Sequence, residues 1–218
     1  MASPARLVQT LSEATGVSLA TLTDIDRKLV KAGLRSKGGR GFNAARMTPL
    51  DAARLLTATL ASAQTTLAVA AVNRYANTRA DPSRSSDDLF GASGLADLAG
   101  LPHQHSFVNG LSALIASAAN GALAEQIAAA KPLSALPQIE VYAFTRATYG
   151  RIRLAGLANR MTVSVEYLPA PPHPRGRVQS AKRRTSATHE NAGDLEQSRR
   201  ISERTILAIA NLLIEEPS

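Results

Sequence analysis

The sequence predicts a mostly helical α+β protein, and three observations lead to this prediction. Apolar residues recur at helical spacing through most of residues 4–130 and again over residues 194–216. Between these regions, residues 138–168 contain three short β-type runs, the last of which alternates apolar and polar residues. The chain has 218 residues, 44% of them hydrophobic, which is enough for one or two domains with a buried core.

The composition excludes several classes of protein. The chain has no cysteine, which rules out a disulfide scaffold and a thiolate metal site and fits the reducing cytoplasm. No run approaches the roughly 18 apolar residues that a membrane-spanning helix needs. The N-terminus lacks the continuous apolar stretch of a signal peptide. We therefore expect a cytoplasmic protein with no membrane segment.

Positive charge is concentrated in two places. The 25 Lys and Arg residues exceed the 17 Asp and Glu residues, which gives a net charge of +8. Residues Arg27 to Arg46 include seven basic residues and no acidic one, and residues 169–189 form a second acid-free basic segment. Such clusters favour a polyanionic partner such as nucleic acid, although a basic surface also keeps a protein soluble.

Residues 1–35 predict two short helices joined by a tight turn. Gly16 ends the first helix, and Ser18 is a suitable N-cap for a second helix that reaches Ala32. The apolar positions are Leu7, Val8 and Leu11 in the first helix and Leu22, Ile25, Leu29 and Val30 in the second. Gly33 then stops the second helix.

Residues 34–63 predict a basic hairpin followed by another helix. A Gly-Gly pair between two short basic arms in residues 34–42 is typical of a hairpin. Thr48 as N-cap, Pro49 at the first helical position and Asp51 in the first turn predict a helix that runs to about Ala63.

Three more helices and a small sheet are expected next. The helices are Thr65–Asn77, Ser86–Ala99 and Ser106–Ala130, the last being the longest. The strands are Gln138–Arg146, Gly150–Leu157 and Arg160–Leu168, which predict a three-stranded antiparallel meander half buried against the helices. A pocket between this sheet and the longest helix would suit a small effector.

The C-terminal part predicts an arm and a helix. Residues 169–192 are rich in proline and positive charge, which is typical of a flexible linker. The apolar stripe of Asp194–Glu216 must pack either on the protein's own core or on another subunit. The expected parts are thus residues 1–47, residues 48–168 with the helical core and sheet, the linker 169–192, and the helix within 193–218.

Residues Leu11 to Ile25 resemble the helix-turn-helix of DNA-binding regulators. The resemblance is carried by the small residue Ser12, by Gly16 at the turn, and by apolar Leu11, Val17, Leu22 and Ile25. The Gly-rich basic segment that follows Gly33 and Leu34 resembles the wing of winged-helix proteins. The resemblance covers roughly the first 40 residues. It implies that the second helix enters the major groove of DNA.

This placement predicts a set of DNA-binding residues. Those expected to reach base edges or nearby phosphates are Ser18, Thr23, Asp24 and Arg27. Those expected along the flanking phosphate backbone are Lys28, Lys31, Arg35, Lys37 and Arg40, with Arg183 and Arg184 added by the basic linker. The alternative interpretations are a small helical unit with a solvated basic face and a linker kept extended by its own charge.

Other residues that could carry chemistry have simpler explanations. Arg151 and Arg153 are expected to pair across strands with Glu140 and Glu166. The nearby aromatic residues leave open the binding of single strands by stacking. His103 and His105 lack a third ligand, so we expect a loop and capping role and no metal. No nucleophile elbow, phosphate-binding loop or dinucleotide motif is present, so we expect neither an enzyme nor a cofactor.

The predicted function is sequence-specific binding of double-stranded DNA by a transcriptional regulator that acts as a homo-oligomer. A dimer is favoured because paired half-sites strengthen the binding of one small reading head. The helix Ser106–Ala130 and the C-terminal helix are the expected interface. The alternative is a phage-type assembly or adaptor protein, either a DNA-packaging recognition subunit or an inhibitor with a protein partner. Small terminase subunits also combine an N-terminal helix-turn-helix with a helical oligomerising core.

Overall fold

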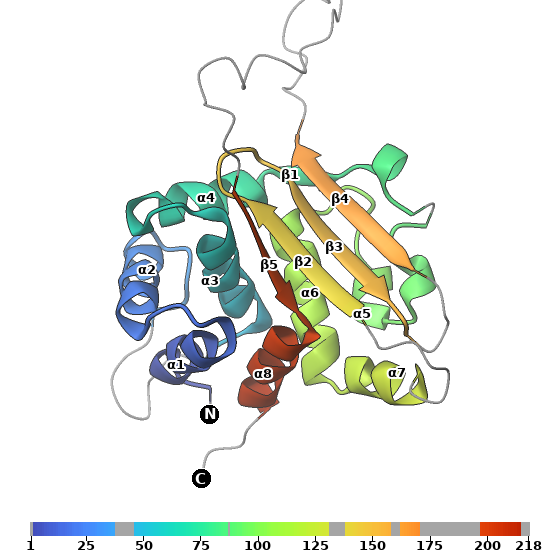
Figure 1. The fold of residues 1–218 in the computed structure, drawn as a ribbon, viewed down its shortest axis with the longest axis horizontal. Coiled ribbons are helices and arrows are strands. Elements are labelled where there is room, and N and C mark those ends of the chain that lie inside the picture. The colour runs from blue at the N-terminus through green and yellow to red at the C-terminus, as the bar shows by residue number, and fades with distance from the viewer. Residues whose placement is uncertain are drawn as a thin grey trace, which may run out of the picture.

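The computed structural model describes residues 2–37, 46–86, 88–130, 138–157, 162–170 and 197–214, and these residues form an α+β fold (Figure 1). The helices are α1 (Pro4–Thr15), α2 (Leu19–Lys31), α3 (Pro49–Ala61), α4 (Ala68–Ala76), α5 (Ala96–Ala99), α6 (Phe107–Ala119), α7 (Ala122–Ala130) and α8 (Glu203–Ile214). The strands are β1 (Thr78–Ala80), β2 (Gln138–Phe144), β3 (Gly150–Ala155), β4 (Val163–Pro169) and β5 (Ser198–Ser202). The mostly helical α+β class is therefore confirmed.

The sheet has five strands in the order β1-β4-β3-β2-β5, and every pair is antiparallel. The predicted meander is confirmed as its central strands, β2, β3 and β4. The prediction of three strands was wrong because it missed both edges. Strand β1 has three residues and β5 reads Ser-Arg-Arg-Ile-Ser, so neither shows an alternating apolar pattern. Their pairing with distant strands, which no local pattern reports, places them in the sheet.

Strand β5 also corrects the expected C-terminal helix. Residues 198–202 pair with β2, with Ile201 opposite Val141, and α8 begins at Glu203. The buried residues of α8 pack against α1, α3 and α6 of the same chain. Of the two possibilities left open for its apolar stripe, the structure selects the protein's own core.

The longest expected helix is interrupted. Residues 107–130 form α6 and α7, which are bent by 75° relative to each other. Gly121 between them has φ +88°, a conformation that other residues rarely adopt, and the Ala122 amide donates to Asn120 Oδ1 at 3.1 Å. The expected helix Ser86–Ala99 is not found as one helix in its described residues 88–99. They form a turn, a short 3₁₀ segment at Gly91–Ser93, and then α5.

Helix starts were easier to predict than helix lengths. Ser18 accepts a hydrogen bond from the Thr21 amide, and Thr48 and Asp51 form a reciprocal capping box at the start of α3. The predicted helix 65–77 is a 3₁₀ turn at Thr65–Leu67 that continues into α4.

Within the described ranges, no single helix combines the length and apolar composition needed to cross a bilayer, although α6 and α7 meet this criterion when counted together.

Helix α6 lies behind the sheet and is buried on most of its surface (Figure 1). A chain of aromatic rings joins it to the sheet: Phe107 contacts Tyr75 and Tyr167, with ring centroids 5.1 and 5.4 Å apart, and His105 contacts Tyr167 at 5.5 Å. Near the start of α6, these rings pack in the region where the sequence predicted a pocket between the sheet and this helix. The buried residues of α1 and α2 belong to the same hydrophobic cluster as those of the sheet.

Gly110 on α6 allows this close approach. A Cβ atom at position 110 would lie 2.3 Å from Tyr167 Oη and 3.2 Å from Ile152 Cδ1. Helix propensity alone would favour Gly110→Ala by about 1 kcal/mol. We instead expect this variant to lower the free energy of unfolding by about 1–3 kcal/mol, because fully buried Tyr167 must move.

Urea denaturation measures this change, with Ser112→Ala on the outer side of α6 as the matched control, expected to stay within about 0.5 kcal/mol of wild type. A Gly110→Ala variant as stable as the wild type would contradict the packing of α6 on the sheet.

Burial lowers the pKa of His105 below its ordinary value. Its Nε2 lies 2.8 Å from Tyr167 Oη and its Nδ1 lies 2.7 Å from the Pro102 carbonyl. The unfolded chain therefore takes up a proton at this residue more readily than the native protein does. Stability should fall as the pH drops below about 6.5, by up to ~1.4 kcal/mol per pH unit.

Denaturation curves across this pH range should show a shallower pH dependence for His105→Gln than for wild type. His103→Gln, at an exposed position in the same turn, is the control and should keep the wild-type slope. The same slope in all three proteins would show that His105 does not carry this pH dependence.

Candidate nucleic-acid interface

The turn between α1 and α2 is held by side-chain hydrogen bonds. Ser12 Oγ donates to the Val17 carbonyl at 2.7 Å, and Ser18 Oγ accepts from the Thr21 amide at 3.2 Å. Leu11 and Leu22 are fully buried on either side of this turn, and Gly16 has φ +72°. Three residues thus connect two helices whose relative orientation is fixed by a shared core.

Helix α2 has two different faces. Leu22, Ile25 and Leu29 are buried, whereas the opposite face is exposed to solvent. The exposed residues, which follow one another at helical spacing, are Ala20, Thr23, Arg27 and Lys31. The exposed first turn also includes Ser18 and Leu19, the latter 52% exposed. Of the predicted residues, the structure therefore brings Thr23, Arg27 and Lys31 together on one outward stripe.

Asp24 and Lys28 neutralise each other beside this stripe. Lys28 Nζ lies 2.5 Å from Asp24 Oδ2 and donates to Thr65 Oγ1 at 2.8 Å. The hydrogen bonds from Lys28 and Thr65 lower the pKa of the Asp24 carboxyl group. Both residues were predicted to contact DNA, but in this structure each already has a partner within the chain.

Arg35 is buried, contrary to its predicted position along a DNA backbone. Its guanidinium forms an ion pair with Asp26, in which Nη2 donates to Asp26 Oδ2 at 2.8 Å. Burial raises the pKa of Asp26, and the charge of Arg35 opposes that shift. The sequence held a signal for this pair, because Asp26 lies on the same helical face as Leu22, Ile25 and Leu29 and so requires a cation.

A second buried carboxylate holds the segment that follows α2. Asp51 accepts hydrogen bonds from the amide of Ser36 at 2.9 Å and from the hydroxyl of Thr48 at 2.7 Å. Burial acts to raise the pKa of Asp51, but these bonds from Ser36 and Thr48 outweigh it and lower the pKa. Lys37, next in the chain, is exposed.

Several predicted residues lie outside the described part of the chain. These are Arg40, with residues 38–42 of the expected wing, and Arg183 and Arg184, with most of the expected linker.

Within the described ranges, no group of three or more potential metal ligands is present, and His105 forms the core contacts described above.

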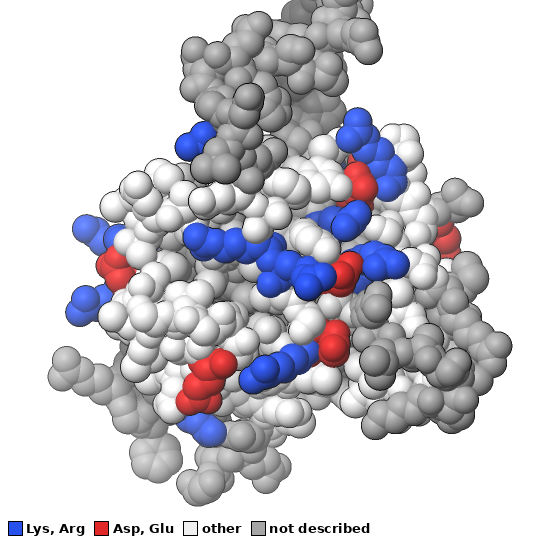
Figure 2. All heavy atoms as spheres, in the orientation of Figure 1, with Lys and Arg blue, Asp and Glu red and all other residues white. Residues whose placement is uncertain are grey.

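The outer face of the sheet carries a second group of charges. Arg153 pairs with Glu140 at 3.2 Å, as the sequence predicted. Arg151 lies opposite Glu166 in the register, but its guanidinium lies over the Tyr142 ring, 4.8 Å from the ring centroid, and forms no ion pair with Glu166. Arg200, which was predicted to lie in a helix, is on β5 and forms a second ion pair with Glu140 at 2.8 Å. Figure 2 shows Lys and Arg side chains in a band across this face, with acidic side chains among them.

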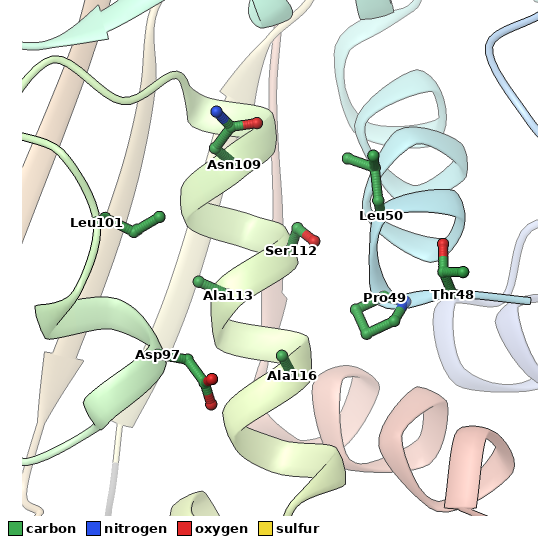
Figure 3. A pocket seen from close by; sticks show the side chains of 9 residues that line it. All are labelled: Thr48, Pro49, Leu50, Asp97, Leu101, Asn109, Ser112, Ala113 and Ala116. Carbon is green, nitrogen blue, oxygen red and sulfur yellow. The ribbon is translucent and has the colours of Figure 1, made fainter.

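One cavity lies on the side of α6 that faces away from the sheet (Figure 3). It measures about 410 Å³ and lies between α6, α5 and the start of α3. Its one carboxylate, Asp97, already accepts from Ser117 and Asn120 at 3.0 and 2.8 Å. The remaining lining is mostly small or apolar, so no set of groups there defines a ligand.

Comparison with protein-family models, curated proteins and solved structures gives no match to this chain.

The buried ion pair between Asp26 and Arg35 leads to a prediction about stability. Arg35→Ala should lower the free energy of unfolding by about 3–5 kcal/mol, because it leaves Asp26 buried without a partner. Lys37→Ala is the matched control: it removes one exposed charge and should leave stability within about 0.5 kcal/mol of wild type.

Chemical denaturation tests both variants, and Asp26→Leu/Arg35→Met should recover most of the lost stability because no charge remains buried. Wild-type stability of Arg35→Ala would mean that the side chain is not held inside the protein.

Proposed function

We propose that the protein binds double-stranded DNA through α1 and α2, which act as a helix-turn-helix with α2 in the major groove. One observation carries the proposal: the exposed stripe of α2 presents Thr23, Arg27 and Lys31, while the opposite stripe is fixed in the core. A helix placed in this way has one face open to solvent, and the major groove is about 12 Å wide, enough to admit a helix.

The distribution of charged residues on α2 supports this proposal. The ion pairs Asp24–Lys28 and Asp26–Arg35 use both acidic residues of the helix, and neither pair includes Arg27 or Lys31. The exposed stripe is therefore positive and faces away from the core. Arg27 and Lys31 would contact phosphates, and Thr23 would reach base edges. Lys37 would extend this surface along the DNA backbone. Arg40, which lies outside the described residues, is still expected to contact the same backbone.

The proposed regulator acts as a homo-oligomer, for the reason that paired half-sites strengthen binding. Its interface would not be the apolar faces of α6 and α8, because both are buried within the subunit. A DNA-packaging recognition subunit would use the same reading head. Sedimentation analysis separates the two functions, since a regulator is expected to form a dimer and a packaging subunit a larger ring.

The double variant Arg27→Ala/Lys31→Ala tests the groove assignment. Fluorescence anisotropy with duplex DNA at several salt concentrations should show weaker binding. Each lost phosphate contact lowers the slope of log K against log salt by roughly 0.9, so the slope should fall by about 1.8.

The matched control is Arg79→Ala/Arg84→Ala, which removes the same charge from β1 and from the 3₁₀ segment Pro82–Arg84 that follows it. It should retain the wild-type slope. If both double variants changed affinity and slope equally, the effect would come from net charge and the assignment of α2 to the groove would be wrong.

A further inference from the structure

A cleft of about 470 Å³ lies where α1, α3, β5 and α8 meet. Its walls are the end of α1 with the following turn, the end of α3, strand β5 and the first turn of α8. This volume lies within the range of about 300–1,000 Å³ that is typical of small-molecule sites. The cleft is distinct from the exposed stripe of α2.

The polar groups of this cleft suit an anion. Three arginines, Arg199, Arg200 and Arg204, line it, and its lining residues in the described part of the chain include no Asp or Glu. The nearest acidic residue of α8, Glu203, accepts a hydrogen bond from the Ile139 amide on β2. Glu140 pairs with Arg200, so at most one of the three positive charges is neutralised.

The three arginines differ in the partners that they already have within the protein. Arg199 Nη1 donates to the neutral Thr59 carbonyl at 2.6 Å, and Arg200 Nη1 donates to Glu140 at 2.8 Å. Arg204 is exposed and forms no ion pair with a described residue. The cleft therefore keeps an excess of positive charge that is not balanced within the described chain.

The hydroxyl group of Thr205 provides a second, independent indication of a ligand. Thr205 is 4% exposed and lines the cleft from the first turn of α8. Its hydroxyl has no hydrogen-bond partner among the described residues. Amide groups in the first turn of a helix also lack partners within the helix and attract anions. A hydroxyl that has no protein partner and lines the cleft is available to donate a hydrogen bond to an oxyanion.

The position of the cleft connects it to the proposed DNA-binding unit. Ala14, Thr15 and Val17 form one wall. Val17 is in the turn between α1 and α2, and its carbonyl accepts the hydrogen bond from Ser12 that holds the turn. A ligand in the cleft would therefore contact the segment that sets the orientation of α2.

We propose that this cleft binds a small phosphorylated effector, whose phosphate is held by Arg199, Arg204 and Thr205, and that the effector changes the affinity of α2 for DNA. The binding of phosphate is independent of the proposed function, whereas the regulatory part rests on it. The guanidinium group of arginine carries a positive charge and can donate two parallel hydrogen bonds to phosphate oxygens, and a hydroxyl group can donate one more.

Calorimetric titration of the full chain with inorganic pyrophosphate tests the site. Wild type should bind with saturation, and Arg204→Ala and Thr205→Val should each bind at least about tenfold more weakly, the equivalent of ~1.4 kcal/mol. Thr205→Val keeps the shape of the side chain and should remain folded. Arg84→Ala, which removes one exposed charge elsewhere, is the control and should bind as wild type does.

Two outcomes of this titration would overturn the proposal. If Thr205→Val and Arg84→Ala both bound pyrophosphate like wild type, the cleft would not be the site. If a short single-stranded oligonucleotide displaced pyrophosphate and bound more tightly, the cleft would hold a nucleic-acid backbone and not a small effector.

The regulatory part is tested by measuring duplex affinity with and without pyrophosphate at constant ionic strength. Wild type should show a change of about fivefold or more, and Thr205→Val should show none. Unchanged duplex affinity with pyrophosphate bound would overturn regulation alone. If wild type bound pyrophosphate but no duplex DNA, the proposed function and its regulation would both fail while the phosphate site would stand.

Discussion

The packing of α6 between the sheet and the other helices is the constraint on which the rest of the structure depends. Gly110 lets the helix approach Tyr167 so closely that the aromatic rings fill the interface. Helices α3 and α8 pack on other sides of α6, and α1 packs on α8. The helix pair α1–α2 is therefore positioned by the same core that supports the sheet.

This common core explains how two candidate sites arise close together. On the buried face of α2, a charge without a partner would cost stability, and Asp26 is paired there with Arg35. The outward face keeps Arg27 and Lys31 available. The cleft at β5 forms because the C-terminal segment returns to the sheet edge and brings three arginines beside the turn of the N-terminal helix pair. Both sites depend on contacts between the two ends of the chain.

Local patterns were sufficient for features that depend on nearby residues. The Ser18 and Thr48 caps, the central strands and the pairing of Arg153 with Glu140 were all predictable from the sequence. Strand β5 and the break after α6 were not, because distant pairing decides the first and a single left-handed glycine decides the second. The position of Arg35 was predicted wrongly for a related reason. The nearby basic residues Lys31 and Lys37 are exposed, but the partner of Arg35, Asp26, lies nine residues earlier on a buried face.

The central claim is that α2 meets duplex DNA with its exposed stripe. The most direct measurement is amide chemical-shift mapping by nuclear magnetic resonance as a short duplex is added to the full chain. The account predicts that the largest changes fall in residues 18–31, with small changes in α7 and at the β1 edge of the sheet. Changes confined to the sheet face or to the basic segment 169–189, with α2 unaffected, would contradict it.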